Sequence, residues 1–219
     1  NLMIEEVSRF HRAGGNSLVD ATCKGIGRDP LALARVSRAT DLNIIMGSGY
    51  YVESFQNADW KNKDEDSMFE EIVRDIQDGV GETGVKAGII GEIGCSWPWT
   101  EPEQRSVRAA ARAQAETGAP LLIHPGRHPS APKQIVEEIE KAGGDLSRTI
   151  MSHICRTISD FETIKDLAET GCYIEYDLFG AEQAFYPLAP TFSMPNDGAR
   201  VDFIIRLIET GHLHQVVVA

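Results

Sequence analysis

The stretch AGIIGEIGC, from Ala87 to Cys95, is an apolar run interrupted near its end by one carboxylate, Glu92. Its continuous, Ile-rich character predicts a β-strand that is covered on both faces. Six other short apolar runs have the same character: Ser17–Cys23, Leu42–Gly47, Pro120–His124, Thr149–Cys155, Cys172–Leu178 and Gln215–Ala219. The sequence therefore predicts seven buried strands.

Longer segments with helical spacing lie between these runs. The segment Pro30–Thr40 follows Asp29, and this Asp-Pro pair predicts a helix N-cap and a first-turn proline. Five more segments have helical spacing: Ser67–Val80, Pro102–Thr117, Pro132–Ala142, Ser159–Thr170 and Ala199–Thr210. Repeated strand–helix units predict a parallel sheet with right-handed crossovers.

Seven such units are one short of a closed eight-stranded barrel. If residues 1–13 are the tail of the first helix, the strand that is not represented is the first one. We therefore expect an α/β fold, a (β/α)8 TIM barrel over residues 1–219 as a single domain, incomplete at both ends. Strand one and the end of strand eight onward are expected to lie outside these residues. An open doubly wound sheet remains an alternative, although no Gly-rich dinucleotide loop follows any strand.

Composition narrows the classes of partner. The formal net charge is −12, which argues against binding to nucleic acid or to an anionic membrane surface, because both need a basic face. No apolar run approaches the length of a membrane span. The four cysteines form no CxxC pair and lie in or beside apolar stretches, which favours reduced thiols in a cytoplasmic protein. We expect a small-molecule substrate and allow for a homodimer.

Three strands carry a polar residue toward their C-terminal end: Glu92, His124 and His153. In a barrel, these strand ends meet around one mouth, so consecutive strands would bring the carboxylate and the two imidazoles together. Glu with two His is a suitable ligand set for zinc or a similar divalent ion. The alternative is that each is a hydrogen-bonded core residue, or that Glu92 pairs with an arginine.

At these residues the sequence resembles the phosphotriesterase-related proteins, a branch of the amidohydrolase superfamily. The similar stretches are Gly91–Pro98, His124–Arg127, Ser152–Thr157 and Glu175–Gly180. The resemblance implies a (β/α)8 barrel with two divalent metal ions, usually zinc. Glu92 would bridge both ions, and His124 and His153 would bind the second.

The resemblance also implies ligands for the first ion that we expect outside these residues. They are a His-x-His pair on strand one and an Asp after strand eight, beyond Ala219, which would accept the proton; no catalytic residue is therefore assigned within the chain. The sequence His212-Leu213-His214 has the His-x-His pattern, but it precedes strand eight. We interpret it as a solvated turn at the bottom of the barrel.

The expected chemistry is hydrolysis by a hydroxide that the metal ions activate, with cleavage of an amide or ester bond. Loops after the strands select the substrate, and the candidates there are Tyr51, Arg127 and Arg156. An arginine at the mouth could hold a carboxylate or sulfonate, or could instead form a structural salt bridge. We favour an N-acyl amino acid or N-acyltaurine as substrate. The alternatives are a lactonase or phosphotriesterase, a metal-dependent nuclease, which the acidic charge disfavours, and a non-catalytic barrel.

Overall fold

The computed structural model describes residues 2–182 and 186–219. Its strands are β1 (Ser17–Asp20), β2 (Asn43–Ser48), β3 (Ile89–Gly94), β4 (Leu121–His124), β5 (Thr149–Met151), β6 (Tyr173–Tyr176) and β7 (Val216–Val218). Its α-helices are α1 (Leu2–Arg12), α2 (Pro30–Thr40), α3 (Glu65–Gln77), α4 (Glu101–Thr117), α5 (Ala131–Lys141), α6 (Phe161–Glu169) and α7 (Asp197–Glu209). Every predicted strand and helix is present, with small shifts at the ends.

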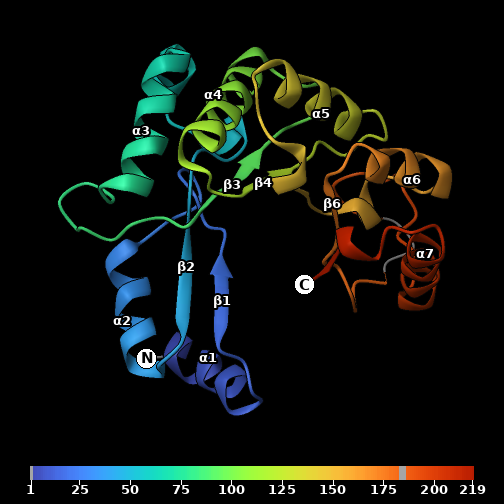
Figure 1. The fold of residues 1–219 in the computed structure, drawn as a ribbon, viewed down its shortest axis with the longest axis horizontal. Coiled ribbons are helices and arrows are strands. Elements are labelled where there is room, and N and C mark those ends of the chain that lie inside the picture. Colours follow the sequence, from blue (N-terminus) through green and yellow to red (C-terminus); the bar gives the residue numbers. More distant parts are fainter. Residues whose placement is uncertain (1, 183–185) are drawn as a thin grey trace.

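The strands form one parallel sheet in the order of the sequence, β1-β2-β3-β4-β5-β6-β7. Figure 1 shows this succession from β1 and β2 through β3 and β4 to β6. Within the described residues β1 pairs only with β2 and β7 only with β6, so the sheet is an open half-barrel. The predicted α/β class and the (β/α) barrel type are confirmed, with these seven strands present.

Local sequence signals account for several helix ends. The Asp29 side chain accepts a hydrogen bond from the Ala32 amide at 2.9 Å, and Pro30 follows it as the first helical residue of α2. Gly118 ends α4 with a left-handed φ of 70°, and its amide bonds to the Gln114 carbonyl at 2.8 Å. These caps set where α2 begins and where α4 ends.

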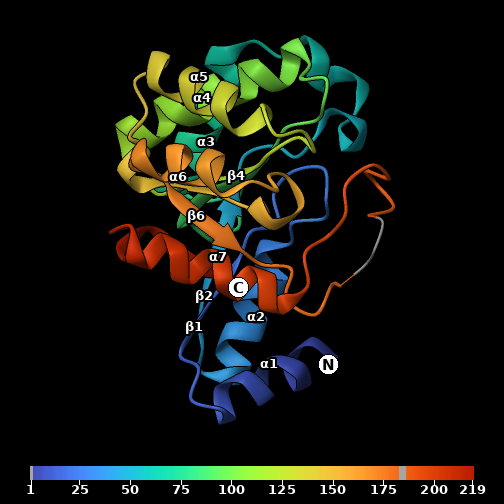
Figure 2. The same ribbon diagram turned by 90° about the vertical axis from the view of Figure 1, so that its right-hand side faces the viewer.

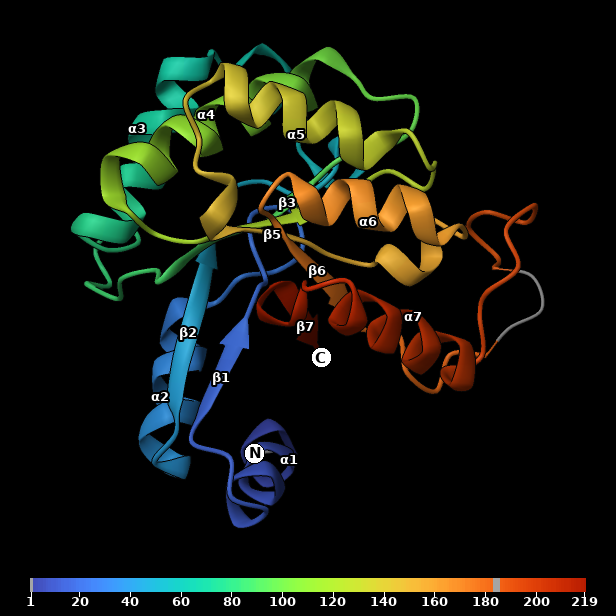
Figure 3. The same ribbon diagram turned by 45° about the vertical axis from the view of Figure 1, so that its right-hand side comes forward.

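Two apolar clusters hold the structure together. The larger extends from Tyr50 and Trp60 to Leu207 and includes the interior residues of β3 to β6 and the alanine-rich face of α4. The smaller consists of Val7, Val36 and Leu42, between α1, α2 and the start of β2. Figure 2 places α1, α2, β1 and β2 at one end of the molecule, away from α3, α4 and α5. Figure 3 shows α3 to α7 in an arc around the strands.

Three of the predicted strands extend at least two residues beyond the C-terminal ends of the observed ones. The run Thr149–Cys155 was expected to be one strand, but β5 ends at Met151, and Ile154–Arg156 forms a 3₁₀ turn. Likewise β1 ends at Asp20 and β6 at Tyr176. His153, after β5, and Asp177, after β6, therefore lie in loops, where their side chains contact each other. All four cysteines are buried and free. In the part of the chain that is described, no helix is long and apolar enough to cross a bilayer.

Candidate metal centre

The three predicted ligands come together from three neighbouring strands. Glu92 is in β3, His124 is the last residue of β4, and His153 lies two residues beyond the end of β5. One ligand atom from each lies within 4.8 Å of the other two. This is the one group of its kind among the described residues. The parallel order of the strands explains the convergence, since their carboxyl ends lie at the same edge.

A β-bulge in β3 sets the direction of the Glu92 side chain. The pairing of β3 with β4 shifts register between Ile90 and Ile93, and Gly91 has a φ of 124°. A Cβ at Gly91 would lie 2.3 Å from the carbonyl oxygen of Leu122, so only glycine fits there. Such a bulge redirects the side chain that follows it. The Glu92 amide then bonds to the carbonyl of Ala21 at 2.8 Å, which ties the bulge to the loop after β1.

Short contacts link the three side chains. One carboxylate oxygen of Glu92 lies 3.0 Å from Nδ1 of His124, and the other lies 2.9 Å from Nε2 of His153. The two ring nitrogens, His124 Nδ1 and His153 Nε2, are 3.0 Å apart. The imidazole rings meet edge to face with centroids 4.6 Å apart. Each donor atom therefore faces the point that a shared cation would occupy.

The surroundings shift the three pKa values differently. Burial opposes ionisation of Glu92, but hydrogen bonds from both histidines outweigh it and lower its pKa to about 2. Burial lowers the pKa of His124 to about 4 against the opposing effect of Glu92. Burial also acts to lower the pKa of His153, but its contacts with Asp177 and Glu92 prevail and raise it. At neutral pH the site therefore holds an ionised carboxylate and a neutral His124, the forms that a metal needs.

This donor set fits a divalent metal ion. One carboxylate and two imidazole nitrogens suit zinc, and the three atoms face a common point in a largely buried setting. The sequence His212-Leu213-His214 does not join the group. His212 Nδ1 lies 2.8 Å from Oε1 of Gln215, and His214 is exposed in the turn at the amino end of β7.

A cavity of about 560 Å³ adjoins His124 and contains two of the three predicted substrate-binding residues, Tyr51 and Arg127. The Tyr51 hydroxyl lies 3.3 Å from both ring nitrogens of His124. Burial raises the pKa of Tyr51 to about 12, so its hydroxyl keeps its proton at neutral pH. The guanidinium of Arg127 lies 5.4 Å from the ring centre of Tyr186 and 3.4 Å from its hydroxyl. Arg127 is thus held at the cavity wall by one aromatic side chain.

Arg156, the third predicted substrate-binding residue, has a different setting. Only 2% of it is exposed, and it does not line this cavity. Its guanidinium donates to the carbonyl of Pro125 at 3.3 Å and lies 3.1 Å from Nε2 of His124. Burial first, and then the charge of Arg127, lower its pKa to about 10. The structure brings Arg156 against a candidate metal ligand rather than to the open mouth.

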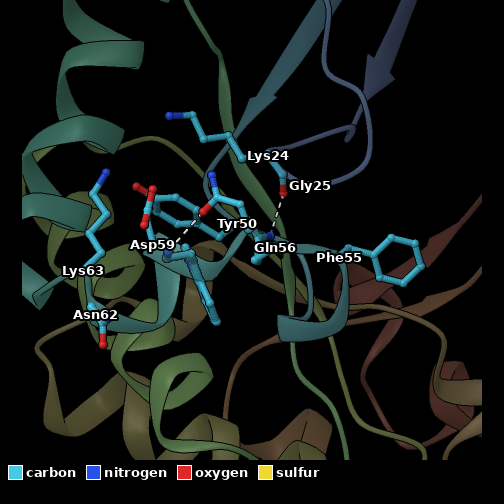
Figure 4. Close-up of a pocket in the computed structure, with 10 residues that line it drawn as sticks. Lys24, Gly25, Tyr50, Phe55, Gln56, Asp59, Asn62 and Lys63 are labelled. Atoms are coloured by element: carbon cyan, nitrogen blue, oxygen red, sulfur yellow. Dashed lines mark hydrogen bonds between the residues drawn. The ribbon is translucent and has the colours of Figure 1, made fainter.

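A second cavity, of about 720 Å³, lies beside the segment that follows β2 (Figure 4). Lys24 and Lys63 line it, and Figure 4 shows their side chains on either side of Tyr50. Both ammonium groups form ion pairs with Glu71, which also accepts a hydrogen bond from the Tyr50 hydroxyl at 2.9 Å. Glu71 thus pairs with both lysines, so we assign this cavity no ligand.

The sequence analysis gave no role to Asp177, which the structure places at the site. Asp177 directly follows β6, and its carboxylate forms an ion pair with Nδ1 of His153. Cys23 was also overlooked, and its thiol donates to the backbone carbonyl of Glu92 at 3.0 Å. The signal for Asp177 was a polar residue toward the C-terminal end of an apolar run, the same signal that pointed to His124.

A row of parallel strands and outer helices, with a carboxylate and two imidazoles at the strand ends, defines a β/α-barrel protein with a candidate metal centre. The chain matches the phosphotriesterase family over residues 1–219. It is 46% identical over 217 residues to a phosphotriesterase-related protein of Nematostella vectensis, covering 99% of this chain and 62% of that protein. It is 43% identical over 218 residues to the N-acetyltaurine hydrolase of Dictyostelium discoideum, covering 100% of this chain and 59% of that protein.

Among solved structures, a resiniferatoxin-binding protein from Rhodobacter sphaeroides superposes with a TM-score of 0.92 at 34% identity. The match covers 99% of this chain and 60% of that chain. The protein therefore belongs to the phosphotriesterase family, as the resemblance predicted. It spans about 60% of the length of these relatives.

Proposed function

We propose that the protein is a metal-dependent hydrolase, with zinc as the metal, that cleaves the amide bond of N-acyl amino acids or N-acyltaurines. The observation that carries the proposal is the cavity that joins the candidate metal centre to a cationic side chain. His124, at the metal centre, and Arg127 line the same cavity. Some relatives at about 43% identity are N-acetyltaurine hydrolases, which supports the choice of substrate class.

Glu92, His124 and His153 would hold the metal. When bound, a divalent ion at such a site activates water for attack and polarises the carbonyl that is attacked. In the overall reaction, water adds its oxygen to the acyl carbon and the C–N bond breaks. The amine leaves with a proton, so the products are a carboxylate and a free amine. Two ions, as the resemblance implies, would need ligands beyond these three.

The cavity residues suit the two ends of such a substrate. Arg127 offers a fixed guanidinium that can bind a carboxylate or sulfonate through two hydrogen bonds. Val52, Phe55 and Leu188 form an apolar part of the wall, which suits the acyl group. Tyr51 keeps its proton at neutral pH. Its hydroxyl, next to His124, can therefore donate a hydrogen bond to the acyl oxygen.

The test is hydrolysis of N-acetyltaurine by the zinc-loaded protein, followed as taurine release. We expect turnover by the wild type and none by Glu92→Gln. Arg127→Gln should raise KM about 10- to 100-fold, because a hydrogen bond to a charged group contributes about 1.5–3 kcal/mol. Arg9→Gln is the matched control, since Arg9 is an exposed arginine of α1, and it should leave KM unchanged.

A neutral lactone separates the alternatives. Because a lactone has no anionic group for Arg127, the Arg127→Gln substitution should not change its turnover if a lactone is accepted at all. Hydrolysis of the lactone with none of N-acyl amides would replace the proposal with a lactonase. Metal binding without turnover of either substrate would favour the non-catalytic barrel.

A further inference from the structure

The structure shows an unassigned carboxylate in contact with a candidate metal ligand. Asp177 follows β6 directly, and about 14% of its side chain is exposed. Its Oδ2 forms an ion pair with Nδ1 of His153. His153 and Asp177 lie just beyond neighbouring strands, β5 and β6, which pair in parallel. The contact therefore follows from the fold and links two loops at the mouth.

The two ring nitrogens of His153 have different partners. Nε2 faces the metal centre, 2.9 Å from Glu92 and 3.0 Å from Nδ1 of His124. Nδ1 faces Asp177 on the opposite side of the ring. A carboxylate oxygen accepts a hydrogen bond, so the contact with Asp177 keeps a proton on Nδ1. In the metal-free protein Nε2 donates to Glu92, and it is this proton, not the one on Nδ1, that a bound cation would displace.

The backbone of His153 does not by itself fix the ring. His153 has a left-handed φ of 56°, an uncommon conformation for a non-glycine residue. Its carbonyl accepts hydrogen bonds from the Thr157 hydroxyl at 2.9 Å and the Arg156 amide at 3.1 Å, which hold the main chain. These backbone bonds leave the side-chain torsions of His153 free. The contact with Asp177 orients the ring through Nδ1, the nitrogen that does not face the metal centre.

His124 lacks an equivalent contact. The neighbours of its outward nitrogen, Nε2, are the guanidinium of Arg156 at 3.1 Å and the hydroxyl of Tyr51 at 3.3 Å, and neither is a carboxylate. Of the two imidazoles, His153 alone has a carboxylate at the ring nitrogen that faces away from the metal centre. This asymmetry makes His153 the ligand that is oriented before a metal arrives.

We propose that Asp177 is a positioning residue that orients His153 and fixes its tautomer for metal binding. The inference rests on the metal site of the proposed function, but not on any substrate. Carboxylates that orient a metal-ligating histidine typically change metal affinity by 10- to 100-fold when they are removed. Asp177 would thus set how tightly the metal is held without touching it.

Glu175 offers a matched control. It lies in β6, two residues before Asp177, is largely buried, and interacts electrostatically with His153 and Glu92. No hydrogen bond or ion pair joins Glu175 to a candidate ligand among the described contacts. Loss of a nearby carboxyl group is therefore common to both substitutions, and loss of the contact with Nδ1 is specific to Asp177.

The experiment is a zinc titration of the metal-free protein by chelator competition, with the visible spectrum of the cobalt-loaded protein as a second readout. We expect Asp177→Ala to raise the zinc Kd about 10- to 100-fold and to alter the cobalt spectrum. Asp177→Asn, which keeps an acceptor oxygen, should give an intermediate Kd. Glu175→Ala should change Kd by less than about threefold with an unaltered spectrum, since its side chain has no contact with the ligands.

Thermal unfolding of each metal-free variant shows which of them are folded. Equal rises in Kd for Asp177→Ala and Glu175→Ala would overturn the inference, because the effect would then not depend on the contact with Nδ1. An unchanged Kd for Asp177→Ala would also overturn it, while leaving the proposed function intact. Absence of zinc binding by the folded wild type would refute both.

Discussion

Replacing Glu92 by glutamine should destabilise the metal-free protein, even though Gln has nearly the same shape. The carboxylate accepts contacts from His124 at 3.0 Å and from His153 at 2.9 Å, which lower its pKa from 4.5 to about 2. At about 1.4 kcal/mol per pKa unit, this corresponds to about 3 kcal/mol of stability at neutral pH. The glutamine amide can satisfy one histidine, so we expect a loss of about 2–3 kcal/mol.

The pH dependence of this loss has a definite sign. The pKa of Glu92 is lowered on folding, so its contribution is complete above pH 4.5 and is lost as the pH falls toward 2. The difference between wild type and Glu92→Gln should therefore be constant between pH 5 and 7 and shrink in more acidic solution. This dependence distinguishes an effect of the charge from an effect of side-chain shape.

The assay is urea unfolding at pH 7 with a chelator present, followed by circular dichroism. Glu209→Gln is the control, because Glu209 is an exposed carboxylate at the end of α7, and it should change stability by less than about 0.5 kcal/mol. A Glu92→Gln variant as stable as the wild type would refute the reasoning. The three side chains would then not stabilise one another without metal.

Three further predictions concern the same region. Gly91→Ala should cost more than about 3 kcal/mol and weaken zinc binding, because a Cβ would lie 2.3 Å from the Leu122 carbonyl oxygen at a φ of 124°. Gly27→Ala shares the positive φ but meets no atom within 4 Å, so urea unfolding should show a loss of only about 1–2 kcal/mol and zinc titration no change. Asp75→Ala should cost about 3–5 kcal/mol, because it leaves Arg28, 2.7 Å from Asp75 in the native protein, buried without its partner; a loss under about 1 kcal/mol in urea would contradict this. Burial lowers the pKa of His124 from 6.5 to about 4, so the unfolded chain takes up that proton first and stability should fall between pH 6.5 and 4. His124→Asn should flatten this part of the profile, whereas His153, whose pKa is raised, contributes a constant amount below pH 6.5.

Apolar patterning was sufficient to predict the order of strands and helices. A continuously apolar run such as Ala87–Cys95 is typical of a strand in a parallel sheet that helices cover, so its pattern predicts an interior strand. The same argument marked Glu92 and His124, because a charged or polar group in such a strand needs a specific partner. The sheet order then brought them together, as the sequence predicted.

Contacts that depend on loop conformation were not predictable in this way. No local signal indicated that β5 would end at Met151, or that His153 would adopt a left-handed φ of 56°. The pairing of His153 with Asp177 depends on how two loops lie side by side, which periodicity does not encode. Arg156 was expected near the mouth from its spacing alone, but the turn Ile154–Arg156 directs it inward against His124. Its role in substrate binding stays a prediction.

The side chains of Tyr50 and Tyr51, at adjacent positions, also have contacts that the sequence did not predict. Successive side chains of an extended segment point to opposite sides. The Tyr50 hydroxyl accordingly reaches Glu71 beside the second cavity, while that of Tyr51 reaches His124. The sequence showed that two aromatic residues follow the strand but not which of them faces the metal centre.

The most direct test of the account is a crystal structure of the zinc-loaded protein with anomalous data collected at the zinc edge. The account predicts an anomalous peak in contact with the Glu92 carboxylate, Nδ1 of His124 and Nε2 of His153, with Asp177 still paired to Nδ1 of His153. A zinc-loaded crystal with no peak among these three side chains, or with zinc bound only elsewhere, would contradict the central claim.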